Sequence, residues 1–192
     1  MTIKTQHTFW FVLFFAGLIL PGCRKDKNEN AADLIRQYQL AGTYKAQITP
    51  SFMGTSPIAS GEHILHVEDL GDGRIRLFYD NFQEPEMPFA MSVDINMTVK
   101  KGGDNTLILE GKNGLFRADP PNGGSIDPDD VMPGIQLPDG AENGMRSDQA
   151  SITGIYGEIE KDGSRALRFD LNLTPGLPLP VQVSIYTKQR IN

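Results

Sequence analysis

Residues 91–100 read MSVDINMTVK, and this segment alternates strictly between apolar and polar side chains. Side chains of a β-strand point to opposite faces in turn, so the pattern predicts a strand with one buried and one solvated face. The predicted buried face consists of Val93, Ile95, Met97 and Val99. The predicted solvated face consists of Ser92, Asp94, Asn96 and Thr98.

The same period of two recurs along most of the chain. Further candidate strands are residues 43–49, 63–69, 74–80, 107–109, 151–160, 165–173 and 181–188. A ninth strand, residues 115–118, follows if Asn113-Gly114 forms a tight turn. Glycine-rich turns at residues 70–73, 102–103 and 162–163 separate neighbouring strands. This spacing predicts an all-β antiparallel meander. Closure into a barrel would remove exposed edges, although a two-sheet sandwich gives much the same pattern.

A short helix is predicted before the first strand. Asn30 is a typical N-cap, Asp33 is an acidic residue in the first turn, and Gly42 is the expected end. The apolar face of this helix would contain Leu34, Ile35 and Tyr38. The expected length is two to three turns.

The N-terminal segment has the pattern of an export signal. Residues 9–20 are apolar but shorter than the roughly 20 residues that span a bilayer. Residues 20–23, LPGC, resemble a bacterial lipobox, in which the cysteine becomes lipidated. We expect residues 1–22 to be a lipoprotein signal peptide, Cys23 to carry the lipid that anchors the chain to a membrane, residues 23–30 to be a flexible tether, and residues 31–192 to form the barrel domain. The alternative is an ordinary signal peptide followed by an incidental cysteine.

The composition excludes several classes of function. The chain of 192 residues has a formal net charge of −6 and scattered basic residues, so we expect no nucleic-acid partner. Cys23 is its only cysteine, and an internal disulfide is therefore impossible. No motif indicates a cofactor.

The candidate metal and catalytic residues have simpler interpretations. His63 and His66 would point to opposite faces of one strand, which disfavours a shared zinc ion. The acidic residues Asp127, Asp129 and Asp130 lie in a long Pro/Gly/Asp-rich loop, residues 119–149, and fit no EF-hand spacing. We expect no metal, and a solvated acidic loop there.

Carboxylate pairs and catalytic motifs give no stronger signal. Glu158 and Glu160 share one face of a strand, as outward-facing residues do. The sequence has no Gly-x-Ser-x-Gly nucleophile elbow and no phosphate-binding glycine loop. The sequence therefore favours a non-enzyme.

Three short motifs indicate a family. Residues 40–44 (LAGTY), 87–95 (MPFAMSVDI) and 153–157 (TGIYG), in this order behind a lipobox, resemble the calycin-like β-barrel lipoproteins of Bacteroides-type bacteria. The resemblance implies a lipocalin-like, eight-stranded up-and-down barrel with a short N-terminal helix, held at the outer membrane. It also implies that Tyr44 closes one end of the barrel, where lipocalins carry a tryptophan.

The functional hypothesis follows from the predicted interior. An eight-stranded barrel is either filled by side chains or holds one small ligand. The candidate ligand-binding residues are Tyr44, Ile75, Leu77, Tyr79, Val93, Ile95, Met97, Leu167, Phe169 and Leu171. We expect a non-catalytic binding module for a small apolar ligand or an envelope partner. The alternative is a structural or interaction lipoprotein with a solid barrel and no small-molecule ligand.

Overall fold

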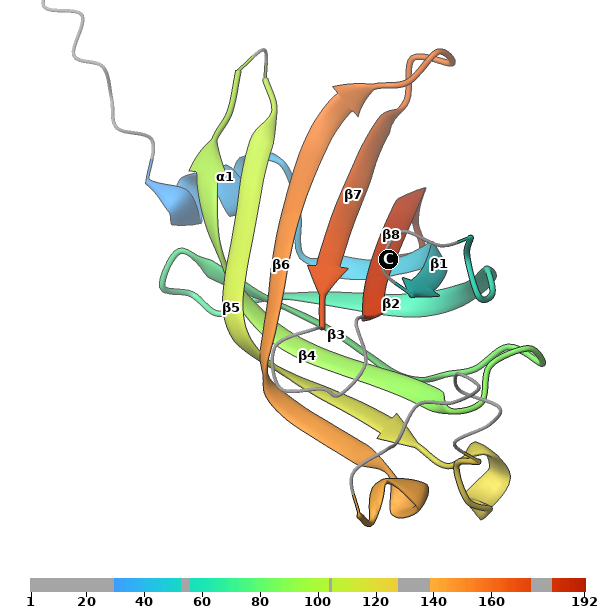
Figure 1. The fold of residues 1–192 in the computed structure, drawn as a ribbon. Helices are drawn as coiled ribbons and strands as arrows, with labels where there is room; N and C mark the ends of the chain where they lie inside the picture. The colour runs from blue at the N-terminus through green and yellow to red at the C-terminus, as the bar shows by residue number, and fades with distance from the viewer. Residues whose placement is uncertain (1–29, 53–55, 104, 128–138, 174–180) are drawn as a thin grey trace, which may run out of the picture.

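Eight antiparallel strands close into an up-and-down barrel in chain order, and a short helix precedes them (Figure 1). The structure is a computed structural model that describes residues 30–52, 56–103, 105–127, 139–173 and 181–192. Its regular elements are α1 (Ala31–Gln37), β1 (Gly42–Phe52), β2 (Gly61–Asp69), β3 (Arg74–Phe82), β4 (Ala90–Lys101), β5 (Leu107–Asp119), β6 (Met145–Ile159), β7 (Arg165–Asn172) and β8 (Val181–Arg190). Two 3-10 turns, η1 (Pro121–Gly123) and η2 (Ala141–Asn143), lie between β5 and β6.

The pairing of β1 with β8 confirms the barrel over the sandwich. Phe52 pairs with Val181 and Tyr44 with Arg190, so the first and last strands join along most of their length. The predicted hairpin turn at residues 70–73 is also present, with Gly71 and Gly73 at φ values of 79° and 82°. Only glycine adopts such angles at little steric cost.

One predicted turn is wrong, and this settles the number of strands. Asn113 does have a positive φ of 56°, but the chain does not reverse there. Met97 pairs with Gly111 and Asp94 with Leu115, so β5 continues along the same partner through a bulge. Residues 107–109 and 115–118 are therefore two halves of one strand, and the barrel has eight strands.

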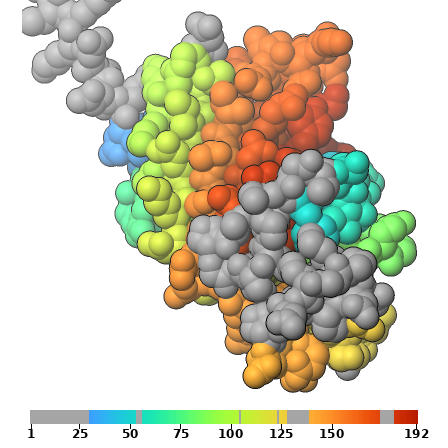
Figure 2. Space-filling view, viewed as in Figure 1, coloured from blue at the N-terminus to red at the C-terminus, as the bar shows by residue number. Residues whose placement is uncertain are grey.

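The C-terminal boundary of the predicted loop also differs. The sequence predicts a loop over residues 119–149, whereas β6 begins at Met145. Ala118 pairs with Met145 and Phe116 with Ser147, which extends the β5–β6 ladder. In the space-filling view, the yellow-green β5 and the orange β6 pack side by side along the wall (Figure 2). Residues 128–138, including Asp129 and Asp130, lie outside the described residues.

The helix α1 closes one end of the barrel. The Asn30 side chain accepts a hydrogen bond from the Ala32 N–H at 3.2 Å, as an N-cap does. Leu34 and Ile35 are buried in the core, as predicted. The helix ends earlier than expected, because Gln39 rather than Gly42 takes the left-handed conformation, with φ of 50°.

The described residues form an extensive hydrophobic core. It runs from Leu34 to Ile185, and its largest fully buried side chains include Phe82, Phe89 and Phe116. Since every strand pairs with two others, a chain that begins at Arg24 contains the whole barrel and its helix. Such a chain has what it needs to fold alone.

The predicted anchor lies outside the part of the chain that the structure describes. This holds for Cys23, for the signal peptide (residues 1–22) and for the tether up to residue 29. Within the described ranges, no helix combines the length and apolar character needed to cross a bilayer.

Candidate functional site

The predicted ligand-binding residues form the packed core of the barrel. All ten are buried, with exposed fractions between 0 and 5%. Facing strands bring them together: Ile75 pairs with Met97, Leu77 with Ile95, and Tyr79 with Val93. Side chains that line a ligand-sized hollow keep accessible surface, and these do not. Their role in binding stays a prediction.

Tyr44 is buried near the segment that follows α1, and the end-closing role that the resemblance implies for it stays a prediction. Its hydroxyl donates a 2.7 Å hydrogen bond to the Leu40 carbonyl, which ties β1 to the segment after α1. Burial raises the pKa of this phenol to about 12, although nearby Arg190 acts in the opposite direction.

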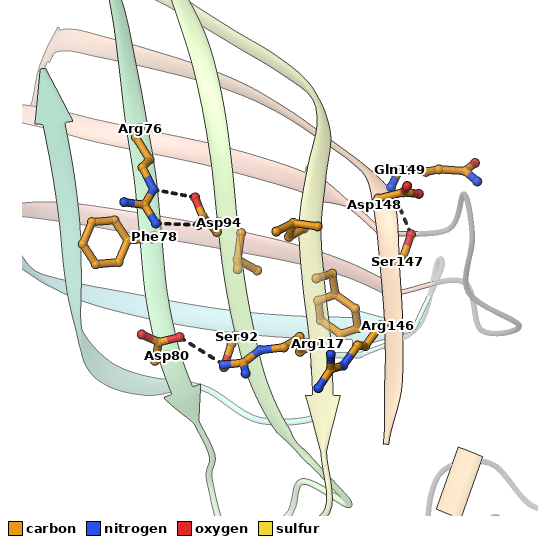
Figure 3. A pocket seen from close by; sticks show the side chains of 13 residues that line it. Arg76, Phe78, Asp80, Ser92, Asp94, Arg117, Arg146, Ser147, Asp148 and Gln149 are labelled. Carbon is orange, nitrogen blue, oxygen red and sulfur yellow. Dashed lines mark hydrogen bonds and ion pairs between the residues drawn. The ribbon is translucent and has the colours of Figure 1, made fainter. Parts of the chain in front are cut away.

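A groove of about 670 Å³ lies on the outer wall of the barrel. Its lining comes from four consecutive strands, β3 to β6 (Figure 3). The polar lining residues are Arg76, Asp80, Ser92, Asp94, Arg117, Arg146, Ser147, Asp148 and Gln149. The apolar lining residues are Phe78, Val93, Leu115 and Phe116.

Bulges in these strands aim outward side chains into the groove. The β3–β4 register shifts between Tyr79 and Phe82, where Asn81 has φ of 54°. The Asn81 N–H donates to Ser92 Oγ at 2.9 Å, and this bond fixes the bulge beside Asp80. A second serine works similarly on β6, because Ser147 Oγ accepts the Gln149 N–H at 3.1 Å. Bulges bend a strand and redirect its side chains.

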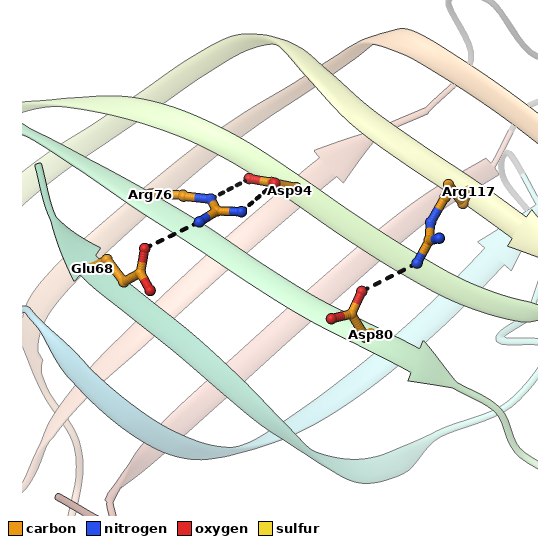
Figure 4. Close-up of polar contacts among 5 residues, drawn as sticks. All are labelled: Glu68, Arg76, Asp80, Asp94 and Arg117. Atoms are coloured by element: carbon orange, nitrogen blue, oxygen red, sulfur yellow. Dashed lines mark hydrogen bonds and ion pairs between the residues drawn. The ribbon is translucent and has the colours of Figure 1, made fainter.

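On one wall of the groove, the charged side chains pair with each other. Arg76 binds Asp94 through two hydrogen bonds of 2.7 and 2.6 Å and reaches Glu68 at 3.2 Å (Figure 4). The hydrogen bonds to Asp94 raise the pKa of Arg76 above its usual value, so this guanidinium stays charged. Arg76 also lies 4.7 Å from the centroid of the Phe78 ring, and the His66 ring stacks on Phe78 at 4.8 Å. This wall is held in place by its own contacts.

The opposite part of the groove contains two less satisfied guanidiniums. Arg117 on β5 and Arg146 on β6 are directly paired in register. Arg117 reaches across β4 toward Asp80, at 3.3 Å (Figure 3, Figure 4). It also lies 3.9 Å from Asp119. Among the described residues, Arg146 has no side-chain hydrogen bond or ion pair.

The groove also has an apolar surface open to solvent. Leu115 is 55% exposed although it lies in mid-strand, and Phe78 is half-buried. Leu115 pairs with Asp94, which pairs with Phe78, so the three residues form one row across the wall. Arg117, two residues beyond Leu115, belongs to the next row with its partners Ser92 and Arg146.

This arrangement is suited to binding. Guanidinium groups bind carboxylates, sulfonates and phosphates through charge-assisted hydrogen bonds, and exposed apolar side chains favour an apolar body. The two serines in the lining are buried, and their hydroxyls accept backbone N–H groups. Among the described residues, no group of three or more His, Cys, Asp or Glu side chains is placed to hold a metal ion.

The remaining candidate residues have structural contacts. His63 Nε2 lies 2.7 Å from the Asp80 carbonyl, and a carbonyl only accepts, so this nitrogen carries the proton. His66 stacks on Phe78 on the opposite face of β2, as the spacing predicted. Glu158 and Glu160 both pair with Arg168 on β7, at 3.5 and 2.6 Å. Asp127, at the edge of the described residues, is exposed.

The sequence interpretation missed the groove. One signal was available, because Phe78 and Leu115 are apolar at positions where the alternation requires polar residues. Arg146 could not be found this way, since the composition of residues 145–149 indicates a loop.

Comparisons with known proteins give no further assignment. The chain matches no family model, and it has no significant match among curated proteins or solved structures. The resemblance to calycin-like β-barrel lipoproteins therefore stays a prediction.

Proposed function

We propose that this chain is a lipid-anchored, non-catalytic binding protein of a bacterial envelope, and that the outer groove is its ligand site. One observation carries the proposal: a hollow of ligand size, lined by arginines and by exposed apolar side chains, lies on the outer wall, while the inward-facing side chains pack as a core. Ligand sites typically have volumes of about 300–1,000 Å³, with apolar walls and a few placed polar groups. The groove has that size and that mixture.

The binding role is tested by looking for a carried ligand. We would purify the full-length lipoprotein from its native envelope, extract it with solvent, and analyse the extract by mass spectrometry. Leu115→Asp places a charge in the groove, and Ile108→Asp makes the same change at an exposed position of β5 outside it. We expect a small molecule to be enriched with the wild type and Ile108→Asp and lost in Leu115→Asp.

The absence of a carried small molecule would contradict the binding role. If no small molecule accompanies the wild type, the groove does not carry a ligand, and the alternative of an interaction lipoprotein with a solid barrel stands. The packed interior already favours that alternative over a ligand inside the barrel.

The anchor is tested separately. Cys23→Ala should abolish metabolic labelling with palmitate and move the protein out of the membrane fraction, because the thiol is the acceptor of the lipid. Ser125→Ala, at an exposed position of the barrel domain, is the control and should keep both properties. Membrane association that persists in Cys23→Ala would contradict a lipid anchor.

A further inference from the structure

We infer that the groove binds an anionic ligand, a soluble small molecule with a carboxylate, sulfonate or phosphate group on an apolar body. This inference rests on the proposed binding function and specifies the class of ligand. It depends on the charges that remain after the groove's internal ion pairs are formed, and on the position of the two apolar side chains Leu115 and Phe78.

The groove's internal ion pairs leave one guanidinium unsatisfied. Three arginines and three aspartates line the groove. Asp94 is neutralised by the two-pronged contact with Arg76, and Asp80 by Arg117. Arg146 has no such carboxylate partner among the described residues, so it is the cation available to a ligand.

The register makes Arg146 more than an isolated surface charge. Directly opposed residues of an antiparallel pair have Cα atoms about 5 Å apart, so the Arg117 and Arg146 side chains start as neighbours. Like charges in this position repel each other. An anion between them would replace the repulsion with charge-assisted hydrogen bonds from both guanidiniums.

The apolar body of the ligand has a place one row away. Leu115 and Arg117 lie on the same face of β5, two residues apart, which is about 7 Å along a strand. Leu115 and Phe78 belong to the same row across the wall. A ligand whose anionic group meets the arginines therefore covers the exposed Leu115, and the accessible part of Phe78, with its body.

Asp148 carries a negative charge at the groove, so changing it tests whether the ligand is an anion. It is exposed at the groove and, among the described residues, has no side-chain hydrogen bond or ion pair. A bound anion would feel its repulsion. Neutralising Asp148 should therefore strengthen the binding of an anion and leave a neutral ligand unaffected.

The experiment compares two fluorescent probes with nearly the same ring system. 1-Anilinonaphthalene-8-sulfonate carries the anion, and N-phenyl-1-naphthylamine lacks it. Both are titrated into the soluble chain 24–192, whose cooperative unfolding in urea is checked first. The variants are Arg146→Gln and Asp148→Asn, with Arg168→Gln as the control, the loss of an outward-facing, ion-paired arginine outside the groove.

The inference predicts a selective change. Arg146→Gln should weaken the binding of the sulfonate probe about tenfold, as expected for the loss of one charge-assisted contact. It should change the affinity for the neutral probe by less than about twofold. Asp148→Asn should strengthen the binding of the sulfonate probe alone. Arg168→Gln should change the affinity for neither probe. Amide chemical-shift changes caused by the sulfonate probe should map to β3–β6.

Three results would overturn the inference. The first is unchanged binding of the sulfonate probe in Arg146→Gln, and the second is an equal loss of affinity for both probes in that variant. The third is a set of amide chemical-shift changes that map outside β3–β6. If Arg146→Gln fails to unfold cooperatively, Arg146→Lys and Arg117→Gln replace it. Arg146→Lys keeps the charge, so it should lose less affinity for the sulfonate probe than Arg117→Gln, which removes a charge. Tight binding of the neutral probe in the groove, without discrimination between the probes, would leave the proposed function standing and overturn only the anionic class.

Discussion

Arg117 and Arg146 are directly opposed residues of β5 and β6, and both side chains line the same groove on the outer wall of the barrel. Arg117 is partly neutralised by Asp80 at 3.3 Å, whereas Arg146 has no ion pair among the described residues. Two like charges in adjacent strands weaken a sheet. This pair therefore contributes to the proposed site at the expense of local stability.

Replacing Arg146 with the opposite charge should stabilise the fold. Arg146→Glu places a carboxylate directly opposite Arg117, and an exposed cross-strand ion pair contributes about 0.5 kcal/mol. We expect a higher free energy of unfolding in urea, a smaller gain for Arg146→Gln, and loss of sulfonate-probe binding. The gain should shrink in high salt, because salt screens exposed charges. Equal or lower stability in Arg146→Glu would show that the two guanidiniums do not repel each other in the folded state.

The strands were predictable where the alternation is unbroken. Residues 91–100, 165–173 and 74–80 bury one face against the core and leave most of the other accessible, so their period of two is visible in the sequence. Ser92, which the alternation places on the solvated face, is buried instead, because its hydroxyl accepts the Asn81 N–H at the bulge. The helix was predictable from its cap and its buried pair. Closure was not, because a barrel and a sandwich require the same local pattern.

The groove could not be predicted, for a physical reason. It depends on which residues oppose each other across strands, and register is set by bulges that local sequence does not reveal. Asn113-Gly114 has the composition of a tight turn but forms a bulge. The start of β6 was missed because a polar residue, Ser147, occupies a buried position there and hides the period.

Glycine at position 111 should be required for the close approach of β5 to its neighbours. A Cβ there would lie 2.7 Å from the Asn96 carbonyl oxygen and 2.9 Å from a methyl carbon of Ile152. Gly111→Ala must therefore move backbone, and we expect it to lower the free energy of unfolding by about 1–3 kcal/mol.

The control for this change is another glycine of the same barrel. A Cβ added at Gly103 would meet no atom within 4 Å, so Gly103→Ala should have little effect. Chemical denaturation of both variants measures the difference. Similar stabilities would mean that the wall between β4 and β6 relaxes easily around an added methyl group.

Two tyrosines should respond in opposite directions to the same chemical change. The Tyr44 hydroxyl donates to Leu40, whereas the Tyr79 hydroxyl is buried without a hydrogen-bond partner among the described residues. Tyr44→Phe should lower the free energy of unfolding by about 1 kcal/mol, and Tyr79→Phe should leave it unchanged or raise it by a similar amount. Urea unfolding at neutral pH measures both. Destabilisation by Tyr79→Phe would indicate that its hydroxyl is satisfied in solution.

Alkaline pH should destabilise the barrel through Tyr44. Burial raises the pKa of Tyr44 to about 12 in the folded protein, while an unfolded tyrosine titrates near its ordinary value of 10.0. Between these values the unfolded chain loses the proton that the folded chain keeps, so the free energy of unfolding falls as the pH rises above about 10. Below that pH the contribution is fully present.

The variant Tyr44→Phe isolates this effect from the titration of lysines. We would measure urea unfolding of the wild type and of Tyr44→Phe at several pH values between about 8 and 11.5. The stability difference between the two should narrow above about pH 10, because only the wild type carries the shifted group at this position. A difference that stays constant across this range would mean that the Tyr44 phenol ionises as readily in the barrel as in water, and that the helix-capped end admits solvent.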